Sequence, residues 1–508
     1  MSAPQAQSLA EPVLKVRRLG LETQHEPIVL MHAECPVARS EGFGARAEIE
    51  LVAEGRSAIA TLYLVRDGIV GPHEIGMSDA VSVRLGVPDG TPAIIRHPQP
   101  VASMSAVRAK LYGHRLEPAR IHEIIRDIVR ERYSDVELAA FVSAFSSQAP
   151  DFGEMVALTR AMVDVGDRLS WPSAMVLDKH SVGGLPANRT TPLIVAIVAA
   201  AGLVIPKTSS RAITSPAGTA DAMETMAPVD LDVAAMRRVV EEEGGCIVWG
   251  GSVSLSPADD ILIRVERALD IDSPAQLVAS VLSKKIAAGS THVLLDMPVG
   301  PTAKVRTDLD AAELSAHLQS VGRELGIVAM PVQTDGRQPV GRGIGPALEA
   351  RDVLSVLRGD AAAPADLKER SLFLAGKLLE LAGRAPAGRG QAEAAAILGD
   401  GRALGKFMAI CEAQGGFTEP PAAPLRHEFV AAAVGKVSGI DNRELARVAK
   451  LAGAPSAKAA GVEIHVKLGD AVDKGQPLFA IHAEARGELD YALAYATANP
   501  DMVDLRAR

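Results

Sequence analysis

The chain has 508 residues, which is too long for one hydrophobic core, so we expect two to four domains. Apolar residues make up 48% of it but aromatic residues only 3%, which predicts aliphatic cores and argues against a surface that stacks the bases of a nucleic-acid strand. The net charge is −9 and no long Lys/Arg run occurs, so a nucleic acid is not an expected partner.

Residues 1–95 are predicted to form a small β-rich domain. Apolar and polar residues alternate over 45–52 and 58–65, a period typical of half-buried strands. The segment 87–92 has the Pro and Gly content of a turn. The N-terminus lacks the charged and apolar regions of a signal peptide, which favours a cytoplasmic protein.

Residues 100–172 are predicted to form a helical domain. Apolar residues in 119–130 are spaced as one face of a helix. Ser134 is placed to cap the helix that follows, and 154–165 predicts a third helix. A later helical segment near 258–290 is expected to join this domain.

The segments 173–257 and 291–420 are predicted to form an α/β domain. A short apolar strand at 174–178 is followed by a glycine turn, a helix with Pro192 in its first turn, and a strand at 204–207. This βαβ order implies a parallel sheet with a ligand crevice at the carboxyl ends of its strands. Further strands are expected at 246–249 and 292–296, and further helices at 275–288, 311–325 and 367–382.

Residues 425–508 are predicted to form a C-terminal α+β domain. The segment 461–481 resembles a barrel-sandwich domain of the biotinyl/lipoyl kind. Such carriers present a modified lysine at a hairpin tip, usually beside Met, and nothing here matches that arrangement, so a carrier role is not expected. The predicted fold class is α/β: a helical domain and a parallel-sheet α/β domain, with a small β-rich N-terminal domain and a barrel-sandwich-like C-terminal domain.

Three cysteines, Cys35, Cys246 and Cys411, are far apart and form no CxxC pair, which argues against a disulfide framework and a zinc site. We expect free thiols and no bound metal. The longest apolar stretch, 193–205, is shorter than the roughly 18–20 residues that a membrane span requires, so no membrane partner is expected.

The strongest polar motif is the run 178–184, Asp-Lys-His-Ser-Val-Gly-Gly, between a predicted strand and a predicted helix. Backbone amides and a helix N-terminus at such a turn can bind an anion. Lys179 adds positive charge, Ser181 adds a hydroxyl donor, and His180 offers a proton donor with a pKa near neutrality. The alternative is a turn with a surface Lys and a structural His, but four polar groups beside two glycines favour the anion site.

A second polar segment, 207–221, follows the second strand of the βαβ unit. It concentrates hydroxyls, Lys, Arg and Gly, which suits a second wall of an anion pocket. On its own this segment is better explained as a polar loop whose Thr219 or Asp221 caps the next helix.

Together the two segments resemble the thymidine phosphorylase family. Residues 178–184 match that family's phosphate loop D-K-H-S-x-G-G, and 209–224 match its signature S-x-R-x-x-T-x-x-x-G-T-x-D-x-x-E. The helical segments and the runs 256–259 and 280–285 are also similar to the family, so the resemblance covers the chain from about residue 104 to its end.

This resemblance implies phosphorolysis, in which a nucleoside and inorganic phosphate give a free base and a pentose 1-phosphate. His180 would lie near the base carbonyl, and Ser280 and Lys284 would contact the base edge. No metal or organic cofactor is implied, because phosphate is itself the nucleophile. The residues that would hold phosphate are Lys179, Ser181, Thr190, Ser209 and Thr219.

The segment after Ser-Pro-Ala-Asp departs from the family pattern. Thymidine phosphorylases carry a Tyr and an Arg there, whereas 260–267 lacks the Tyr, and Arg264 or Arg267 fits only with a shifted alignment. The N-terminal extension and the segments 184–192 and 296–304 are more similar to AMP phosphorylases and to long bacterial thymidine phosphorylases.

That second resemblance implies a set of nucleotide-binding residues and a proton donor. Asp272 would donate the proton, with Lys179 and His180 as the other catalytic residues; the alternative for Asp272 is an exposed loop carboxylate before Ser273 and Pro274. The nucleotide-binding residues would be Gly184, Ser210, Arg211, Ala212, Ile213, Thr214, Ser215, Thr219, Ser280 and Lys304.

We therefore expect a pentosyltransferase that acts on a pyrimidine nucleoside such as thymidine. The alternatives are a nucleoside monophosphate phosphorylase giving ribose 1,5-bisphosphate, and a non-catalytic nucleotide-binding protein. A phosphoribosyltransferase of the anthranilate type would carry a Lys-His-Gly-Asn loop, which 179–182 lacks. Similar enzymes are homodimers or larger, and glycines near 183 and 250 are candidate hinges for domain closure.

Overall fold

The computed structural model of the chain describes residues 13–24, 26–66, 68–147, 151–212, 215–269, 271 and 273–506. It divides into two compact units. The first contains the chain up to Met104 together with Arg130–Ser134, and the second contains Ser105–Val129 and Asp135–Arg508. Within the described ranges, no helix combines the length and apolar character needed to cross a membrane.

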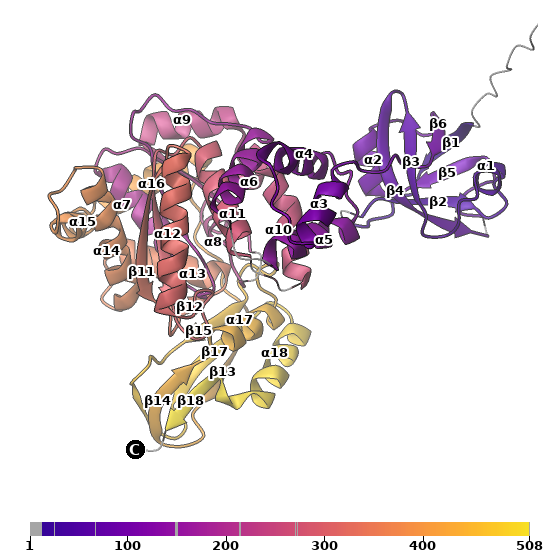
Figure 1. Cartoon of the computed structure of the whole chain (residues 1–508). Coiled ribbons are helices and arrows are strands. Elements are labelled where there is room, and N and C mark those ends of the chain that lie inside the picture. Colours follow the sequence, from indigo (N-terminus) through magenta and orange to yellow (C-terminus); the bar gives the residue numbers. More distant parts are fainter. Residues whose placement is uncertain are drawn as a thin grey trace, which may run out of the picture. The chain divides into compact units, whose positions relative to one another are not determined.

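The first unit is a closed barrel of six strands in the order β1-β5-β2-β4-β3-β6 (Figure 1). Alternate side chains face its interior: Ile49, Leu51 and Ala53 of β3 are buried, as the period-two pattern predicts. The β-rich prediction for this region is confirmed. The strands are β1 (Val13–Arg18), β2 (Ile28–His32), β3 (Glu48–Ala53), β4 (Arg56–Val65), β5 (Glu74–Met77) and β6 (Pro92–Arg96).

Two short helices in this unit were not predicted: α1 (Pro36–Ser40) and α2 (Asp79–Leu85). Helix α2 follows Ser78 and ends at Gly86, whose φ of 57° is the left-handed conformation common after a helix. These start and stop signals were present in the sequence, but the surrounding strand pattern hid them.

The second unit begins with a bundle of helices. In α4, Ile121, Ile124, Ile125 and Ile128 form the buried stripe expected from their spacing. Helix α6 packs against α4 and α11, and α5 packs against α10, so the late helical segment lies beside the early one. The helices are α3 (Met104–Leu111), α4 (Pro118–Val129), α5 (Asp135–Ser146), α6 (Phe152–Asp164), α10 (Pro257–Leu269) and α11 (Pro274–Ala287).

The centre of the second unit is a set of parallel strands. One sheet has the order β11-β10-β7 and another pairs β8 with β9; an isolated parallel bridge between Val176 and Val204 joins their edges. The chain runs outward from β7 to β8 and β9, then returns to the other side of β7 as β10. The strands are β7 (Leu177–Ser181), β8 (Ile205–Ser209), β9 (Gly245–Trp249), β10 (His292–Val299) and β11 (Val328–Asp335).

The reversal of strand order between β7 and β10 is a topological switch point, where open α/β sheets bind ligands. Helix α7 (Thr190–Ala200), which follows β7, is almost wholly buried and packs against α14 and α16, while α12 packs on β10 and β11 (Figure 1). The other helices of this part are α8 (Thr219–Glu224), α9 (Val233–Glu243), α12 (Asp308–Glu324), α13 (Pro346–Arg358), α14 (Ala365–Leu381), α15 (Gly390–Gly399) and α16 (Arg402–Gln414).

The C-terminal part has two small sheets and two helices, α17 and α18, that pack on each other. One sheet, β12-β15-β17-β13, takes β12 (Gly343–Ile344) from the α/β part, so hydrogen bonds link the two regions. The other sheet is β16-β14-β18. The elements are β13 (Leu425–Val430), β14 (Gly435–Ile440), α17 (Asn442–Leu451), β15 (Gly461–Ile464), β16 (Ala471–Val472), β17 (Pro477–Ala483), α18 (Arg486–Ala498) and β18 (Val503–Arg506).

Candidate active site

The two polar segments lie at the carboxyl ends of neighbouring strands. Asp178–Ser181 belongs to β7 itself and Lys207–Ser209 to β8, whereas the sequence predicted that both strands would end earlier. The strands continue through these charged residues because the side chains find buried partners of opposite charge. The motif is therefore held by sheet hydrogen bonds rather than by a free loop.

Lys179 is almost completely buried, at 1% exposure. Its ammonium nitrogen donates a hydrogen bond to Thr190 Oγ1 at 3.0 Å and lies 3.6 Å from Asp296 Oδ2. Burial lowers the pKa of Lys179 to about 8, against the opposing attraction of Asp296. Thr190 is the first residue of α7, so Lys179 links the strand to the helix that follows it.

Asp296 on β10 is the carboxylate that balances Lys179. It is fully buried and accepts hydrogen bonds from Thr334 Oγ1 at 2.7 Å and from Asn188 Nδ2 at 3.3 Å. The same Asn188 amide lies 3.5 Å from Ser181 Oγ. Sequence reasoning missed Asp296 and Asn188 as site residues, although Asp296 stands at the end of a predicted apolar strand.

Asp178 forms ion pairs with two further buried lysines, Lys285 and Lys207. Its carboxylate is 2.8 Å from Lys285 Nζ and 3.6 Å from Lys207 Nζ, and it accepts a hydrogen bond from Ser290 at 3.3 Å. Burial would raise the pKa of Asp178, but the two ammonium groups outweigh it and lower that pKa. Burial also lowers the pKa of Lys207 to about 7. The sequence placed Lys207 in the second polar segment without assigning it a role, and Lys285 was not predicted as a site residue.

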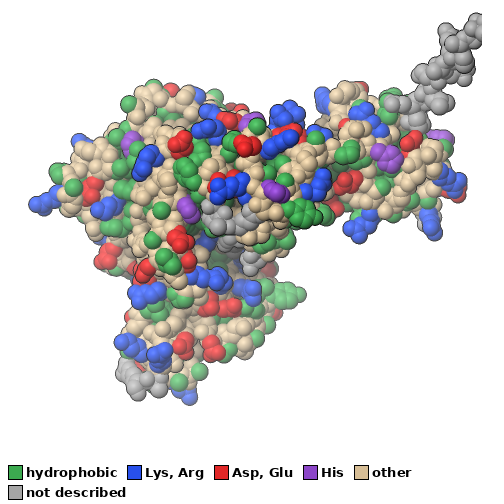
Figure 2. Space-filling model, viewed as in Figure 1, with side chains coloured by type: hydrophobic (Ala, Val, Ile, Leu, Met, Phe, Trp, Pro, Cys, Tyr) green, Lys and Arg blue, Asp and Glu red, His purple; other side chains and the backbone are tan. Residues whose placement is uncertain are grey.

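The buried ionisable groups around β7 carry an excess of positive charge. Lys179, Lys207 and Lys285 face two carboxylates, Asp178 and Asp296. When all three lysines are protonated, one positive charge lacks a compensating carboxylate in this set. Lys207, whose pKa burial lowers to about 7, is the lysine whose charged form a bound anion would stabilise. On the surface, by contrast, positive and negative side chains are interspersed over the face shown in Figure 2.

His180 follows Lys179 on the strand and keeps part of its surface exposed. Burial first, and then the charges of Lys285 and Lys207, lower the pKa of His180 well below its ordinary value. The sequence predicted a pKa near neutrality; in the fold that pKa is lowered, chiefly because the imidazole is buried and secondly because lysines distant in the sequence lie near it. At neutral pH the imidazole is uncharged, with one N–H to donate.

The glycine pair after β7 brings a distant loop into the site. Gly183 and Gly184 have φ values of 98° and 80°, a conformation that favours glycine. A Cβ on Gly184 would lie 2.2 Å from the backbone nitrogen of Lys304. Gly184 and Lys304, both predicted to bind nucleotide, are therefore in direct backbone contact.

Ser209 and Thr219, the two predicted phosphate residues of the second segment, lie at the end of β8 and the start of α8. The Ser209 hydroxyl is buried and makes no hydrogen bond within the described residues. Buried hydroxyls without a partner are rare, and a ligand is one explanation for them. Thr219 Oγ1 accepts a hydrogen bond from Arg189 at 2.6 Å.

Arg211 is engaged by carboxylates. It donates to both oxygens of Glu224 at 2.7 and 2.9 Å, and lies 3.4 Å from Asp221 and 4.9 Å from the centre of a Trp249 ring. The Arg211 hydrogen bond lowers the pKa of Glu224 to about 2. The Arg211 guanidinium therefore binds carboxylates of the helix that follows its loop. It is less available to a nucleotide than the sequence-based prediction required.

The rest of the 210–215 run is only partly described. Ser210 is exposed, the Ala212 amide donates to Asp221 at 2.6 Å, and Ser215 Oγ donates to Ala217 O at 2.9 Å. Three predicted site residues lie outside the described residues: Ile213, Thr214 and Asp272.

The predicted base-side residues Ser280 and Lys284 are one helical turn apart on α11. Ser280 is partly exposed, and Lys284 forms an ion pair with Asp259 of α10. Burial would lower the pKa of Lys284, but Asp259 outweighs it and raises that pKa. Burial raises the pKa of the neighbouring Asp260. The sequence did not identify these carboxylates as partners of the base side.

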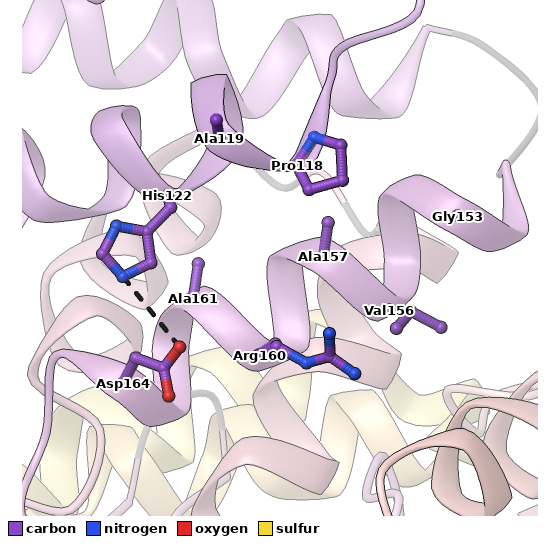
Figure 3. Close-up of a pocket in the computed structure, with 9 residues that line it drawn as sticks. All are labelled: Pro118, Ala119, His122, Gly153, Val156, Ala157, Arg160, Ala161 and Asp164. Atoms are coloured by element: carbon purple, nitrogen blue, oxygen red, sulfur yellow. Dashed lines mark ion pairs between the residues drawn. The ribbon is translucent and has the colours of Figure 1, made fainter.

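A hollow of about 270 Å³ lies elsewhere, between α4 and α6 (Figure 3). Small side chains such as Ala157 and Ala161 line it, with His122 and Asp164 at one end, 4.0 Å apart. No residue of the two polar segments lines it, so it is separate from the candidate site. Among the described residues, no group of three or more His, Cys, Asp or Glu is placed to hold a metal.

Three family models match successive parts of the chain. Residues 104–166 match the helical bundle domain of a glycosyl transferase family, 173–404 match its a/b domain, and 436–502 match the pyrimidine nucleoside phosphorylase C-terminal domain. Together they cover the helical, α/β and C-terminal parts of the second unit.

Curated relatives are similar over their full length. A protein of Sphingopyxis alaskensis is 57% identical over 100% of this chain and 99% of its own, and one of a Polaromonas species is 58% identical over 98% and 97%. Both carry the name "Putative thymidine phosphorylase". A solved anthranilate phosphoribosyltransferase from Thermus thermophilus is 20% identical, with a TM-score of 0.51 over 61% of this chain and 99% of its own, which shows a shared fold.

Proposed function

Because the chain belongs to the thymidine phosphorylase family of glycosyl transferases, we propose that it catalyses the reversible phosphorolysis of a pyrimidine nucleoside such as thymidine. A phosphate oxygen attacks the anomeric carbon as the bond to the base nitrogen breaks. The products are the free base, which takes up a proton, and a pentose 1-phosphate. No metal or organic cofactor takes part in this proposal.

The excess positive charge at the switch point is the observation that carries the proposal. Lys179, Lys207 and Lys285 outnumber the carboxylates Asp178 and Asp296. Phosphate is an anion under the conditions of the reaction and would complete this balance. Fixed charges of this kind, buried away from water, stabilise a reacting anion without reorganisation, and phosphate held beside the sugar also supplies proximity.

In the proposed phosphate site, Lys179, Thr190 and Ser209 form a buried part, and Ser181 and Thr219 form a partly exposed edge. The unpartnered Ser209 hydroxyl supports this assignment. The buried ammonium contributes charge, and the hydroxyls contribute donors that orient the phosphate for attack.

On the base side, Ser280 and Lys284 are proposed to contact the base edge. The uncharged His180 is proposed to donate a hydrogen bond to a base carbonyl, which stabilises the negative charge that develops on the leaving base. Asp272 is proposed as the proton donor. A positioned general acid typically contributes about 10²–10⁴-fold.

A nucleoside monophosphate is the second candidate substrate. The backbone contact between Gly184 and Lys304 favours this substrate, because the contact places the loop that carries the Lys304 side chain against the phosphate loop. A 5′-phosphate would be a suitable partner for Lys304. The products would then be a base and ribose 1,5-bisphosphate.

A homodimer or larger assembly, located in the cytoplasm, is also part of the proposal. The three free, buried cysteines suit a reducing compartment.

One assay separates the candidates. Purified protein is incubated with thymidine, uridine, cytidine, AMP, CMP or UMP, with and without inorganic phosphate, and free base is measured. Base release from nucleosides only when phosphate is present supports the first candidate, and release from monophosphates supports the second. Absence of phosphate-dependent release from all six would refute the enzyme proposal.

A further inference from the structure

We infer that Asn188 and Arg189, which precede α7, are positioning residues that connect the two walls of the phosphate pocket and aim the Thr219 hydroxyl at the phosphate. The inference rests on the proposed function. It adds two residues to the site that neither the motif nor the proposed ligand set contains.

Three consecutive side chains reach three of the proposed phosphate residues. Asn188 Nδ2 lies 3.5 Å from Ser181 Oγ, and Arg189 Nη1 donates to Thr219 Oγ1 at 2.6 Å. Thr190 Oγ1 accepts a hydrogen bond from the Lys179 ammonium at 3.0 Å. The short stretch 188–190 therefore touches both the strand β7 and the start of α8, which otherwise belong to separate parts of the fold.

The backbone at this stretch is strained. Ala187 and Asn188 have φ values of 59° and 49°, in the left-handed region that costs a residue with a Cβ about 1 kcal/mol. Val340 holds them there through a parallel bridge to Ala187 and a hydrogen bond from the Asn188 amide at 2.9 Å. Such strain persists where the surrounding structure fixes it, and it turns successive side chains toward different walls.

Arg189 contacts helix α13, helix α8 and the loop that precedes α8. Its guanidinium donates to Glu349 of α13 at 2.7 and 2.5 Å and to the Ala217 carbonyl at 3.0 Å, besides Thr219. Arg189 and Glu349 are both buried, at 9% and 1% exposure. Burial raises the pKa of Glu349 to about 7, and above that pH its carboxylate neutralises Arg189, so Arg189 is not an additional charge for phosphate there. Its contribution is geometric.

The direction of the hydrogen bond to Thr219 carries the functional argument. A hydroxyl has one proton to donate and two lone pairs that accept. Arg189 donates to Thr219 Oγ1, so that oxygen acts as the acceptor and its proton remains free for another group. Thr219 is partly exposed, so its hydroxyl proton can face a ligand. Arg189 thereby makes Thr219 a directed donor.

Two variants test this on the full-length protein. R189K keeps the charge but is too short to reach Glu349, Ala217 and Thr219 together. R189M/E349L replaces the ion pair by apolar side chains of similar size, which avoids leaving a buried charge unpaired. The dissociation constant of inorganic phosphate is measured by titration calorimetry, and the KM of the nucleoside is measured separately.

We expect both variants to raise the dissociation constant of phosphate at least tenfold and to change the nucleoside KM less than twofold. The matched control is K110M, which breaks a buried ion pair with Glu154 in the helical bundle. It should lower the melting temperature but leave the dissociation constant of phosphate unchanged. A variant that folds and binds phosphate as tightly as the wild type would overturn the inference.

A double-mutant cycle separates positioning from general damage. T219V alone should weaken phosphate binding about tenfold, whereas in the R189M/E349L background it should add less than a twofold effect, because Thr219 is no longer aimed. If the fold-changes in the phosphate dissociation constant caused by T219V and by R189M/E349L simply multiplied, the inference would be contradicted, but the proposed phosphorolysis would not. Failure of the wild-type protein to bind phosphate or release base would instead contradict the proposed function.

Discussion

The phosphate side of the candidate site and its base side are built differently. The phosphate side stands on parallel strands, and Lys179, Asp178 and Asp296 are buried and connected through partners on other elements. The base side stands on two helices, where Lys284 pairs with Asp259 and Ser280 remains partly exposed. In the proposed site, the sheet therefore fixes the residues that would bind phosphate, while the residues that would contact the base lie on helices outside that sheet.

This difference fits what the sequence shows. The phosphate loop 178–184 matches the family pattern in full, and the departure, a missing Tyr, falls in 260–267 on the base side. Substitutions on one face of α10 leave the packing of the sheet intact, because α10 packs against helices of the bundle. If the proposed assignments hold, base specificity and phosphate chemistry belong to separate parts of the fold.

The largest expected effect comes from removing the Lys179 charge from the phosphate side of the candidate site. Replacing Lys179 by Ala removes the buried ammonium and leaves Asp296 without its cation. We expect kcat/KM for phosphate to fall about 10³-fold, the scale of losing a preorganised electrostatic contact. Steady-state kinetics with phosphate varied checks this, and full activity in K179A would remove Lys179 from the site.

A smaller effect is expected on the base side. Replacing Lys284 by Met removes the proposed contact to the base edge. It also removes the ion pair with Asp259, which is left without its cation. We expect the nucleoside KM to rise about tenfold, which corresponds to roughly 1.4 kcal/mol, with the KM of phosphate unchanged. If K284M impaired phosphate and nucleoside equally, the two sides would not be separate.

The smallest effect is the pH dependence of phosphate binding. The pKa of Lys179 is about 8, lowered by burial, so its ammonium form is lost as pH rises through that value. We expect kcat/KM for phosphate to decline above pH 8, because the group that binds phosphate becomes neutral, while the nucleoside KM changes little. A profile that stays flat from pH 7 to pH 9.5 would contradict this titration.

The sequence predicted the local parts of this structure well. The isoleucines of α4 lie on one face, the βαβ unit is present, and Lys179 and Thr190 meet across the turn between β7 and α7. Each of these depends on residues close together in the chain, whose periodicity or motif can be recognised. The alternation in the N-terminal region likewise indicated the strands of the barrel.

The partners that decide the charges could not be predicted, because they are distant in sequence. Asp178 pairs with Lys285, more than 100 positions away, and Arg189 pairs with Glu349 at a greater separation. No local pattern indicates such pairs. The lowered pKa of His180 could not be predicted either, since it depends first on burial in the fold and then on lysines from β8 and α11.

The central claim is that this chain transfers a pentose to phosphate in a pocket built on β7 and β8. The most direct measurement incubates the purified protein with thymidine, varies inorganic phosphate, and quantifies thymine and pentose 1-phosphate together. The account predicts that both products form in equal amounts and that the rate saturates with phosphate. Thymine released without phosphate, or without an equal amount of pentose 1-phosphate, would contradict it.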